Sequence, residues 1–248
     1  MLTPARPVLV VIAHGSRDPR HAATVHALVR RVRSLRPGLR VETGFLEFNV
    51  PSVQGVLESL AAEGVRDVVA LPLLLTRAFH AKADIPAVLA DAPGRLRIRQ
   101  AEVLGPSPLL LSALERRLNE AGLSPADKSS TGVVLASAGS TDPEAIAVIA
   151  DIAREWRHTG WCAVRPAFAS ASLPRTEDAV RELRALGCAR VAVAPYVLAP
   201  GFLPDRIARG AAEADILADV LGPAPEVARL LLHRYDAART PALTAVGA

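Results

Sequence analysis

The chain repeats itself, and this repeat limits its fold more than any other feature of the sequence. The segment VVIAHGSRDP (residues 10–19) returns as VVLASAGSTDP (133–143) with one extra residue. Residues 50–75 match residues 173–198 without a gap, and segments beginning LGPSP and LGPAP follow in the same order. A unit of about 115 residues is therefore present twice, which predicts two domains of one fold.

Each half alternates between apolar runs of strand length and segments with helical spacing. In the first half the expected strands are residues 7–13, 39–48, 65–75 and 96–105, and the expected helices are 18–35, 50–64, 84–91 and 107–122. Strands that are apolar on both faces and separated by helices indicate a parallel sheet between helical layers. We therefore expect an α/β fold of two tandem domains, residues 1–125 and 126–248, each with a mainly parallel four-stranded sheet flanked by helices.

Composition excludes several classes of protein. Half of the 248 residues are apolar, and the net charge of +4 is spread along the chain without a basic run, so nucleic-acid binding is not indicated. The longest apolar run, VVALPLLL, is too short for a membrane span, and no signal peptide is recognisable at the start, so we expect a cytoplasmic protein. Cys162 and Cys188 lack metal-site spacing and are expected to be two small buried residues.

Three side chains that can bind a metal or carry a proton follow three expected strands of the first half. His14 follows the first strand, Glu47 lies at the end of the second, and His80 follows the third. Ligands of open parallel α/β sheets bind beyond the carboxyl ends of the strands, so these three residues are expected at one edge of one sheet.

The second half serves as an internal control for these residues. It retains the turn and helix start, with Gly139, Ser140, Asp142 and Pro143 for Gly15, Ser16, Asp18 and Pro19. Its counterparts of the three candidates are Ala138 for His14, Ser170 for Glu47 and Leu203 for His80. A structural role would be expected to persist in both copies of the fold, whereas a chemical role needs only one site.

Two imidazoles and a carboxylate suit iron(II), cobalt(II), nickel(II) or zinc, held permanently or passed on, and the same groups can act as bases. Cationic side chains flank the two histidine loops and favour a substrate with several carboxylates: Arg17, Arg20, Arg77 and Lys82.

The segments HGSRDP, FLEFNVPSV and LPLLLTRAFHAKADIP resemble the CbiX/SirB group of class II chelatases, and the resemblance covers nearly the whole chain in its duplicated, two-domain form. It implies two chelatase domains facing each other across a cleft, and insertion of Fe²⁺ or Co²⁺ into sirohydrochlorin for sirohaem or cobalamin synthesis. It also maps the metal-binding histidines onto His14 and His80, and the active-site glutamate onto Glu47. The expected substrate contacts are Ser16, Arg17, Arg77 and Lys82.

The metal is then a substrate, no permanently bound cofactor is expected, and the chain has no ATP-binding P-loop pattern. A phosphatase or mutase using His14 as phosphoryl acceptor is disfavoured, because Ala13 stands where an arginine is preferred. A non-catalytic tetrapyrrole or metal carrier remains the main alternative. The sequence leaves open the physiological metal, the pathway, the choice between a monomer and a homodimer, and whether Glu47 is a base or a ligand.

Overall fold

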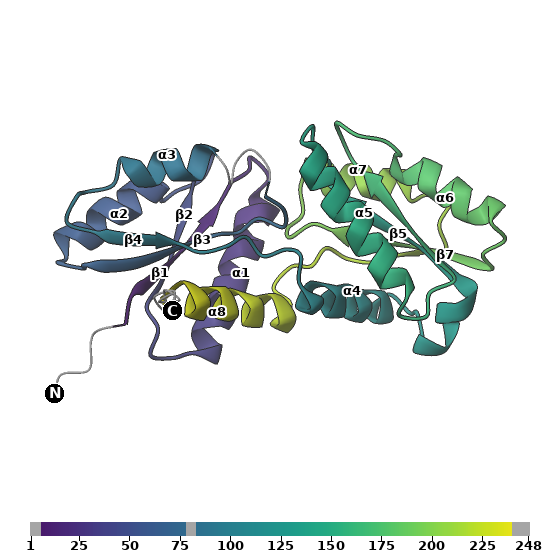
Figure 1. The fold of residues 1–248 in the computed structure, drawn as a ribbon, viewed down its shortest axis with the longest axis horizontal. Helices are drawn as coiled ribbons and strands as arrows, with labels where there is room; N and C mark the ends of the chain where they lie inside the picture. Colours follow the sequence, from purple (N-terminus) through teal and green to yellow (C-terminus); the bar gives the residue numbers. More distant parts are fainter. Residues whose placement is uncertain (1–5, 78–82, 240–248) are drawn as a thin grey trace, which may run out of the picture.

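The computed structural model, which describes residues 6–77 and 83–239, has two lobes, each with a four-stranded parallel sheet (Figure 1). The first lobe has the strand order β2-β1-β3-β4 and the second has the order β6-β5-β7-β8. The strands are β1 (Val8–Ala13), β2 (Val41–Phe45), β3 (Asp67–Pro72), β4 (Arg97–Gln100), β5 (Thr131–Ser137), β6 (Ala163–Phe168), β7 (Arg190–Tyr196) and β8 (Ile216–Leu217).

Helices connect these strands, and every strand and helix predicted for the first half is present, with shorter ends. The helices are α1 (Pro19–Leu35), α2 (Val53–Ala62), α3 (Ile85–Ala90), α4 (Pro108–Glu120), α5 (Pro143–Arg157), α6 (Thr176–Ala185), α7 (Phe202–Gly210) and α8 (Pro225–Arg239), with a 3₁₀ helix at Pro125–Ser130. The α1 helix begins at Pro19 because the Asp18 carboxylate caps it, accepting the Arg20 backbone N–H at 2.9 Å. The predicted two-domain α/β fold is confirmed.

Alternate residues of each central strand are buried on opposite faces, as both-sided burial requires. In β1, Val10 and Ile12 pack with the cluster under α2 and α3, whereas Leu9 and Val11 belong to a cluster on the other face. That second cluster continues into the other lobe and includes Leu135 of β5, so one buried apolar core spans both lobes.

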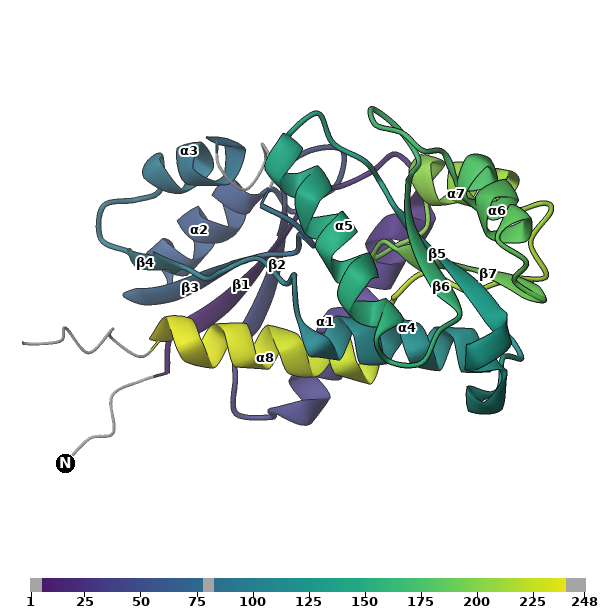
Figure 2. The same ribbon diagram turned by 45° about the vertical axis from the view of Figure 1, so that its right-hand side comes forward.

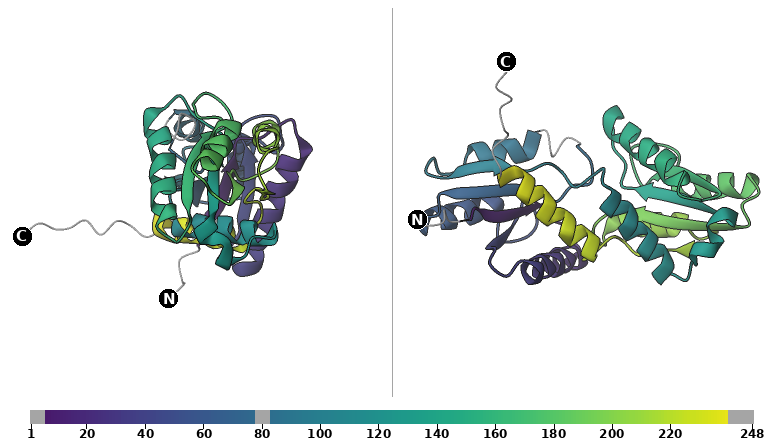
Figure 3. Two further views of the ribbon diagram at one scale, coloured as in Figure 1. Left: turned by 90° about the vertical axis from the view of Figure 1, so that its right-hand side faces the viewer. Right: turned by 60° about the horizontal axis from the view of Figure 1, so that its bottom comes forward.

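The last helix of each half packs on the lobe of the other half. The α8 helix contacts α1, β3 and β4, and α4 contacts β7, while α4 and α8 also pack against each other. Figures 2 and 3 show α8, in yellow, lying along the first sheet. A boundary near residue 125 therefore separates the two sheets along the chain, but α4 and α8 cross it in space.

Polar contacts hold α8 in this exchanged position. The Tyr235 hydroxyl donates to the carbonyl oxygen of Pro7 at 2.7 Å, just before β1. The Arg36 guanidinium donates twice to the Asp236 carboxylate, at 2.7 and 2.8 Å. Since bidentate arginine–carboxylate pairs are geometrically selective, this pair sets the orientation of α8 on the first lobe.

The two cysteines lie side by side, with 3.5 Å between their sulfur atoms. Cys188 is buried as predicted, but the same prediction for Cys162 is wrong, because Cys162 is exposed just before β6. In the part of the chain that the structure describes, no helix is long and apolar enough to cross a membrane.

The helix exchange predicts where a core substitution acts. Leu231 of α8 is fully buried, so Leu231→Ala should lower the free energy of unfolding by about 2–5 kcal/mol. Native-state hydrogen exchange should show the loss of protection in β3 and β4 of the first lobe. Leu183→Ala on α6, equally buried but packed on the second sheet, is the matched control. Loss confined to β5–β7 in the Leu231 variant would contradict the exchange.

Candidate active site between the two lobes

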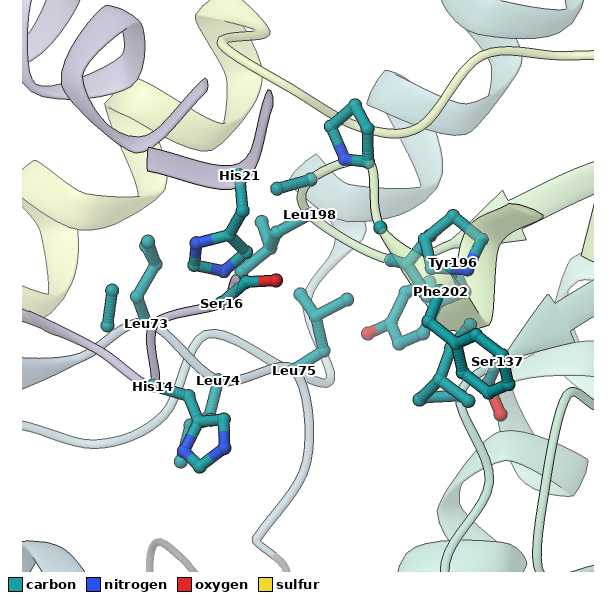
Figure 4. A pocket seen from close by; sticks show the side chains of 18 of the residues that line it. His14, Ser16, His21, Leu73, Leu74, Leu75, Ser137, Tyr196, Leu198 and Phe202 are labelled. Carbon is teal, nitrogen blue, oxygen red and sulfur yellow. The ribbon is translucent and has the colours of Figure 1, made fainter. Parts of the chain in front are cut away.

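A cavity of about 480 Å³ lies between the lobes, at the carboxyl ends of their central strands (Figure 4). The first wall comes from the loops after β1 and β3 and from the start of α1: Ala13–Ser16, His21, Val25 and Leu73–Thr76. The second wall comes from the ends of β5 and β7 with the loops that follow them, and from α5 and the start of α7: Ser137–Gly139, Ile149 and Tyr196–Pro204. The volume is in the range of small-molecule sites, and most of the lining is apolar.

His14 and Glu47 are brought together through their backbones. The Glu47 N–H donates to the carbonyl oxygen of His14 at 2.9 Å. Gly15, which follows His14, has φ +96°, and a Cβ atom at Gly15 would collide with the Glu47 carbonyl oxygen. Only glycine allows both the positive φ and this close approach, so Gly15 is required for the loop after β1 to touch the loop after β2.

Ser16 completes the same turn. Its backbone N–H donates to Asn49 Oδ1 at 2.8 Å, and its hydroxyl oxygen accepts the Asp18 N–H at 3.1 Å. Ser140 accepts the Asp142 N–H in the same way in the second half, at 3.0 Å. The Ser16 hydroxyl is therefore part of the repeated turn as well as the lining of the cavity.

The second half reproduces this arrangement without its reactive side chains. The Ser170 N–H donates to the Ala138 carbonyl oxygen at 3.0 Å. Gly139 has φ +94°, and a Cβ atom there would collide with the Ser170 carbonyl oxygen. The structure thus confirms the predicted pairing of His14 with Ala138 and of Glu47 with Ser170.

An exposed aromatic residue that the sequence analysis did not single out borders the corner formed by His14 and Glu47. Phe48, with φ +61°, is 54% exposed, and its ring centroid lies 6.4 Å from that of the half-buried His14. The Arg17 guanidinium lies 5.0 Å from the Phe48 ring centroid, within cation–π range. Residues 39–48 were predicted to form one strand, but β2 ends at Phe45, and the turn that follows presents Glu47 and Phe48 to solvent.

The structure places only one of the three remaining predicted site residues, Arg77, His80 and Lys82. Arg77 is exposed and lies 3.6 Å from a carboxylate oxygen of Glu102. His80 and Lys82 lie outside the described residues. Within residues 6–77 and 83–239, no three His, Cys, Asp or Glu side chains form a group that could hold a metal ion, and the predicted set depends on His80.

The second wall contains parts of two segments of the second half, AGSTDP (138–143) and PYVLAPGF (195–202), through Ala138, Gly139 and the run from Tyr196 to Phe202. Tyr196 has a buried hydroxyl with no hydrogen-bond partner among the described residues, and burial raises its pKa. Phe202 is 71% exposed beside the cavity. Among the described residues, those of the second wall that line the cavity offer mainly apolar surface and include no carboxylate or imidazole.

An ion pair joins the two walls beside the cavity. Arg20, at the start of α1, donates to Asp18 at 2.6 Å and to Asp205 of α7 at 2.7 Å. Both members of the pair between the walls are about half exposed, so its contribution to stability is small. Arg20, expected as a cation near a polyanionic substrate, is thus already shared between two carboxylates.

Comparison with known proteins agrees with this geometry. The family model CbiX matches residues 8–121 and again residues 132–238. The sirohydrochlorin cobaltochelatase of Priestia megaterium is 30% identical over 206 residues, which cover 80% of this chain and 66% of that protein. The sirohydrochlorin ferrochelatase of the same organism is 26% identical over 236 residues, covering 91% and 88%. The structure of SirB from Bacillus subtilis with Fe³⁺ superposes with a TM-score of 0.80 at 24% identity, covering 93% and 94%.

This chain belongs to the CbiX family, since the family model matches both halves and nearly all the described residues. The match to each half separately agrees with the repeated turn at Gly15 and Gly139.

The paired glycines provide a test of the corner formed by His14 and Glu47. Gly15→Ala and Gly139→Ala should each lower the free energy of unfolding by at least about 1–2 kcal/mol, because both positions have positive φ. Only Gly15→Ala displaces His14 from Glu47, so only this variant should also lose most of its activity per folded molecule. Equal losses of activity in the two variants would contradict a special role for the first half.

Proposed function

We propose that this protein is a sirohydrochlorin chelatase, which inserts Fe²⁺ or Co²⁺ into sirohydrochlorin without consuming ATP. The observation that carries the proposal is the asymmetry of the cleft. Two equivalent turns face one cavity, but only the first carries an imidazole, His14, and only the loop that contacts this first turn carries a carboxylate, Glu47. Relatives along most of the chain are named as sirohydrochlorin cobaltochelatase and ferrochelatase.

The shape of the cleft suits a flat macrocycle. Leu73, Leu74 and Leu75 line one side, and Val197, Leu198 and Ala199 line the other (Figure 4). Burial of both faces of a tetrapyrrole against apolar side chains supplies binding energy in proportion to the area removed from water. The eight carboxylate arms of sirohydrochlorin can remain at the mouth of the cleft, where Arg17 is exposed.

The proposed mechanism divides the work between metal delivery and proton removal. His14 and His80 present M²⁺ to the ring, and neutral imidazole suits a transient site because it releases metal more readily than a set of thiolates. Metallation replaces two pyrrole N–H protons by the metal. Glu47, exposed beside His14, assists ligation or accepts a proton. Ser16, Arg17, Arg77 and Lys82 are the proposed substrate contacts.

The second half is proposed to act as a wall rather than as a second active site. Ala138, Ser170 and Leu203 replace the three reactive residues, and none of them can bind a divalent metal at the equivalent place. One metal site per chain follows, and one chain supplies both walls of the cleft. We expect the protein to act in the cytoplasm.

A non-catalytic carrier of metal or tetrapyrrole is the alternative, since it would need the same ligands and the same cleft. Steady-state metallation distinguishes a chelatase from a carrier. A chelatase accelerates metal insertion over the uncatalysed reaction, whereas a carrier only binds the metal or the tetrapyrrole. The relatives carry names for both cobalt and iron, so Co²⁺ and Fe²⁺ should be compared in the same assay.

Glu47→Gln should reduce turnover more than it reduces sirohydrochlorin binding, because glutamine keeps the size of glutamate but loses its charge and basicity. General-base contributions are typically about 10²–10⁴-fold, which sets the expected loss in kcat. The matched control is Ser170→Ala at the equivalent position, which should leave kcat close to that of the unmodified protein. Equal losses of binding and turnover would mean that Glu47 orders the cleft and moves no proton.

Titration with Co²⁺ should reveal one site per chain, and the His14→Ala, His80→Ala double variant should lose it. Each single variant should lose most metallation while unfolding near the temperature of the unmodified protein, because His14 lies on a half-buried loop outside the core. Retention of the cobalt site in the double variant would exclude these two histidines as the ligands.

A further inference from the structure

A second histidine of the described residues lines the cleft, and the mechanism above does not use it. His21 lies on the first turn of α1 and contributes to the first wall together with His14 (Figure 4). Its ring is half-buried, and its Nδ1 atom is buried with no hydrogen-bond partner among the described residues. An unpartnered polar atom in a mostly apolar cleft is costly, which favours a functional reason for keeping it.

The repeat isolates His21 in the same way as it isolates His14. The Asp18 and Asp142 side chains cap equivalent helices, accepting the N–H of the second following residue at 2.9 and 3.0 Å. Proline begins both helices, and the residue two positions further on is His21 in α1 but Ala145 in α5. The shared helix start therefore does not need an imidazole, which is present only in the half that carries His14 and Glu47.

The surroundings of His21 disfavour the protonated form of its imidazole. Burial is the main cause that lowers its pKa, the charge of His14 lowers it further, and Asp18 acts in the opposite direction. A neutral imidazole has one nitrogen lone pair that can accept a proton.

We propose that His21 is a further catalytic residue, the base that takes one of the two protons which sirohydrochlorin loses when the metal enters. This inference rests on the proposed function. The pyrrole N–H bond breaks, its electron pair stays on the pyrrole nitrogen and forms the bond to M²⁺, and the proton binds the free ring nitrogen of His21. The resulting imidazolium then gives the proton to water at the mouth of the cleft.

Two protons leave for each metal inserted, so a single acceptor would have to act twice. His14 cannot serve while its lone pair binds the metal. Glu47 lies on the exposed turn at the edge of the first wall, whereas His21 lies on α1 and lines the cavity itself. The two residues thus approach a macrocycle in the cleft from different elements.

The test compares His21→Ala and His21→Asn with His26→Ala in the full-length protein. His26 is the matched control, because it lies on the same helix but packs against Phe45, with 5.8 Å between ring centroids, and does not line the cavity. Steady-state metallation with Co²⁺ gives kcat and the KM for sirohydrochlorin, and cobalt titration without tetrapyrrole gives the metal affinity.

Both His21 variants should lower kcat by about 10²-fold or more, with the KM for sirohydrochlorin and the cobalt affinity little changed. Asparagine retains hydrogen-bonding atoms near the position of Nδ1 but is not a base, so it should not restore the rate. Added imidazole should restore part of kcat in His21→Ala and should not raise kcat in the unmodified protein or in His26→Ala.

Near-normal kcat in either His21 variant would overturn the inference. A weakened cobalt affinity with normal kcat at saturating metal would also overturn it, because His21 would then be a metal ligand. A raised KM for sirohydrochlorin without rescue by imidazole would overturn it as well, because His21 would then only form part of the wall. An unmodified protein that does not accelerate metallation would overturn the proposed function itself, and this inference with it.

Discussion

The exchange of the two last helices is the constraint on which the arrangement of the cleft depends. The helix α8 covers the first sheet although it ends the second half, and α4 covers the second sheet although it ends the first. Both helices belong to one apolar cluster that contains Leu9 of the first sheet and Leu135 of the second, so neither lobe can turn far without breaking buried contacts. The distance between the walls is therefore set by a core, and the exposed Arg20–Asp205 pair only adds to it.

The duplication distinguishes backbone features that both halves share from reactive side chains that only the first half carries. The glycine with positive φ, the capped helix and the contact between neighbouring loops occur in both halves, at Gly15 and again at Gly139. These features belong to the fold, because they persist where no reactive group is present. The second half supplies mainly apolar surface opposite His14.

Much of this architecture could be predicted from the sequence, because strands that are apolar on both faces and helix starts with a capping residue are recognisable from short stretches of sequence. The same signals place His14 and Glu47 at one sheet edge, since the carboxyl ends of parallel strands meet there. The helix exchange could not be predicted, because α4 and α8 come from equivalent segments of the repeat, and an apolar helix face does not itself specify which of two similar sheets it covers. Phe48 was missed because β2 ends three residues before it, and only the turn at φ +61° exposes it. The signal for His21 was present in its pairing with Ala145, but its direction into the cleft required the structure.

A crystal structure of the protein with Co²⁺ and sirohydrochlorin bound is the most direct test of the roles assigned to the two halves. We predict that the macrocycle lies between Leu73–Leu75 and Val197–Ala199, with a single cobalt ion on the His14 side of the ring. A macrocycle bound outside this cleft, or a cobalt ion held by residues of the second wall, would contradict the claim that one half performs the chemistry and the other completes the site.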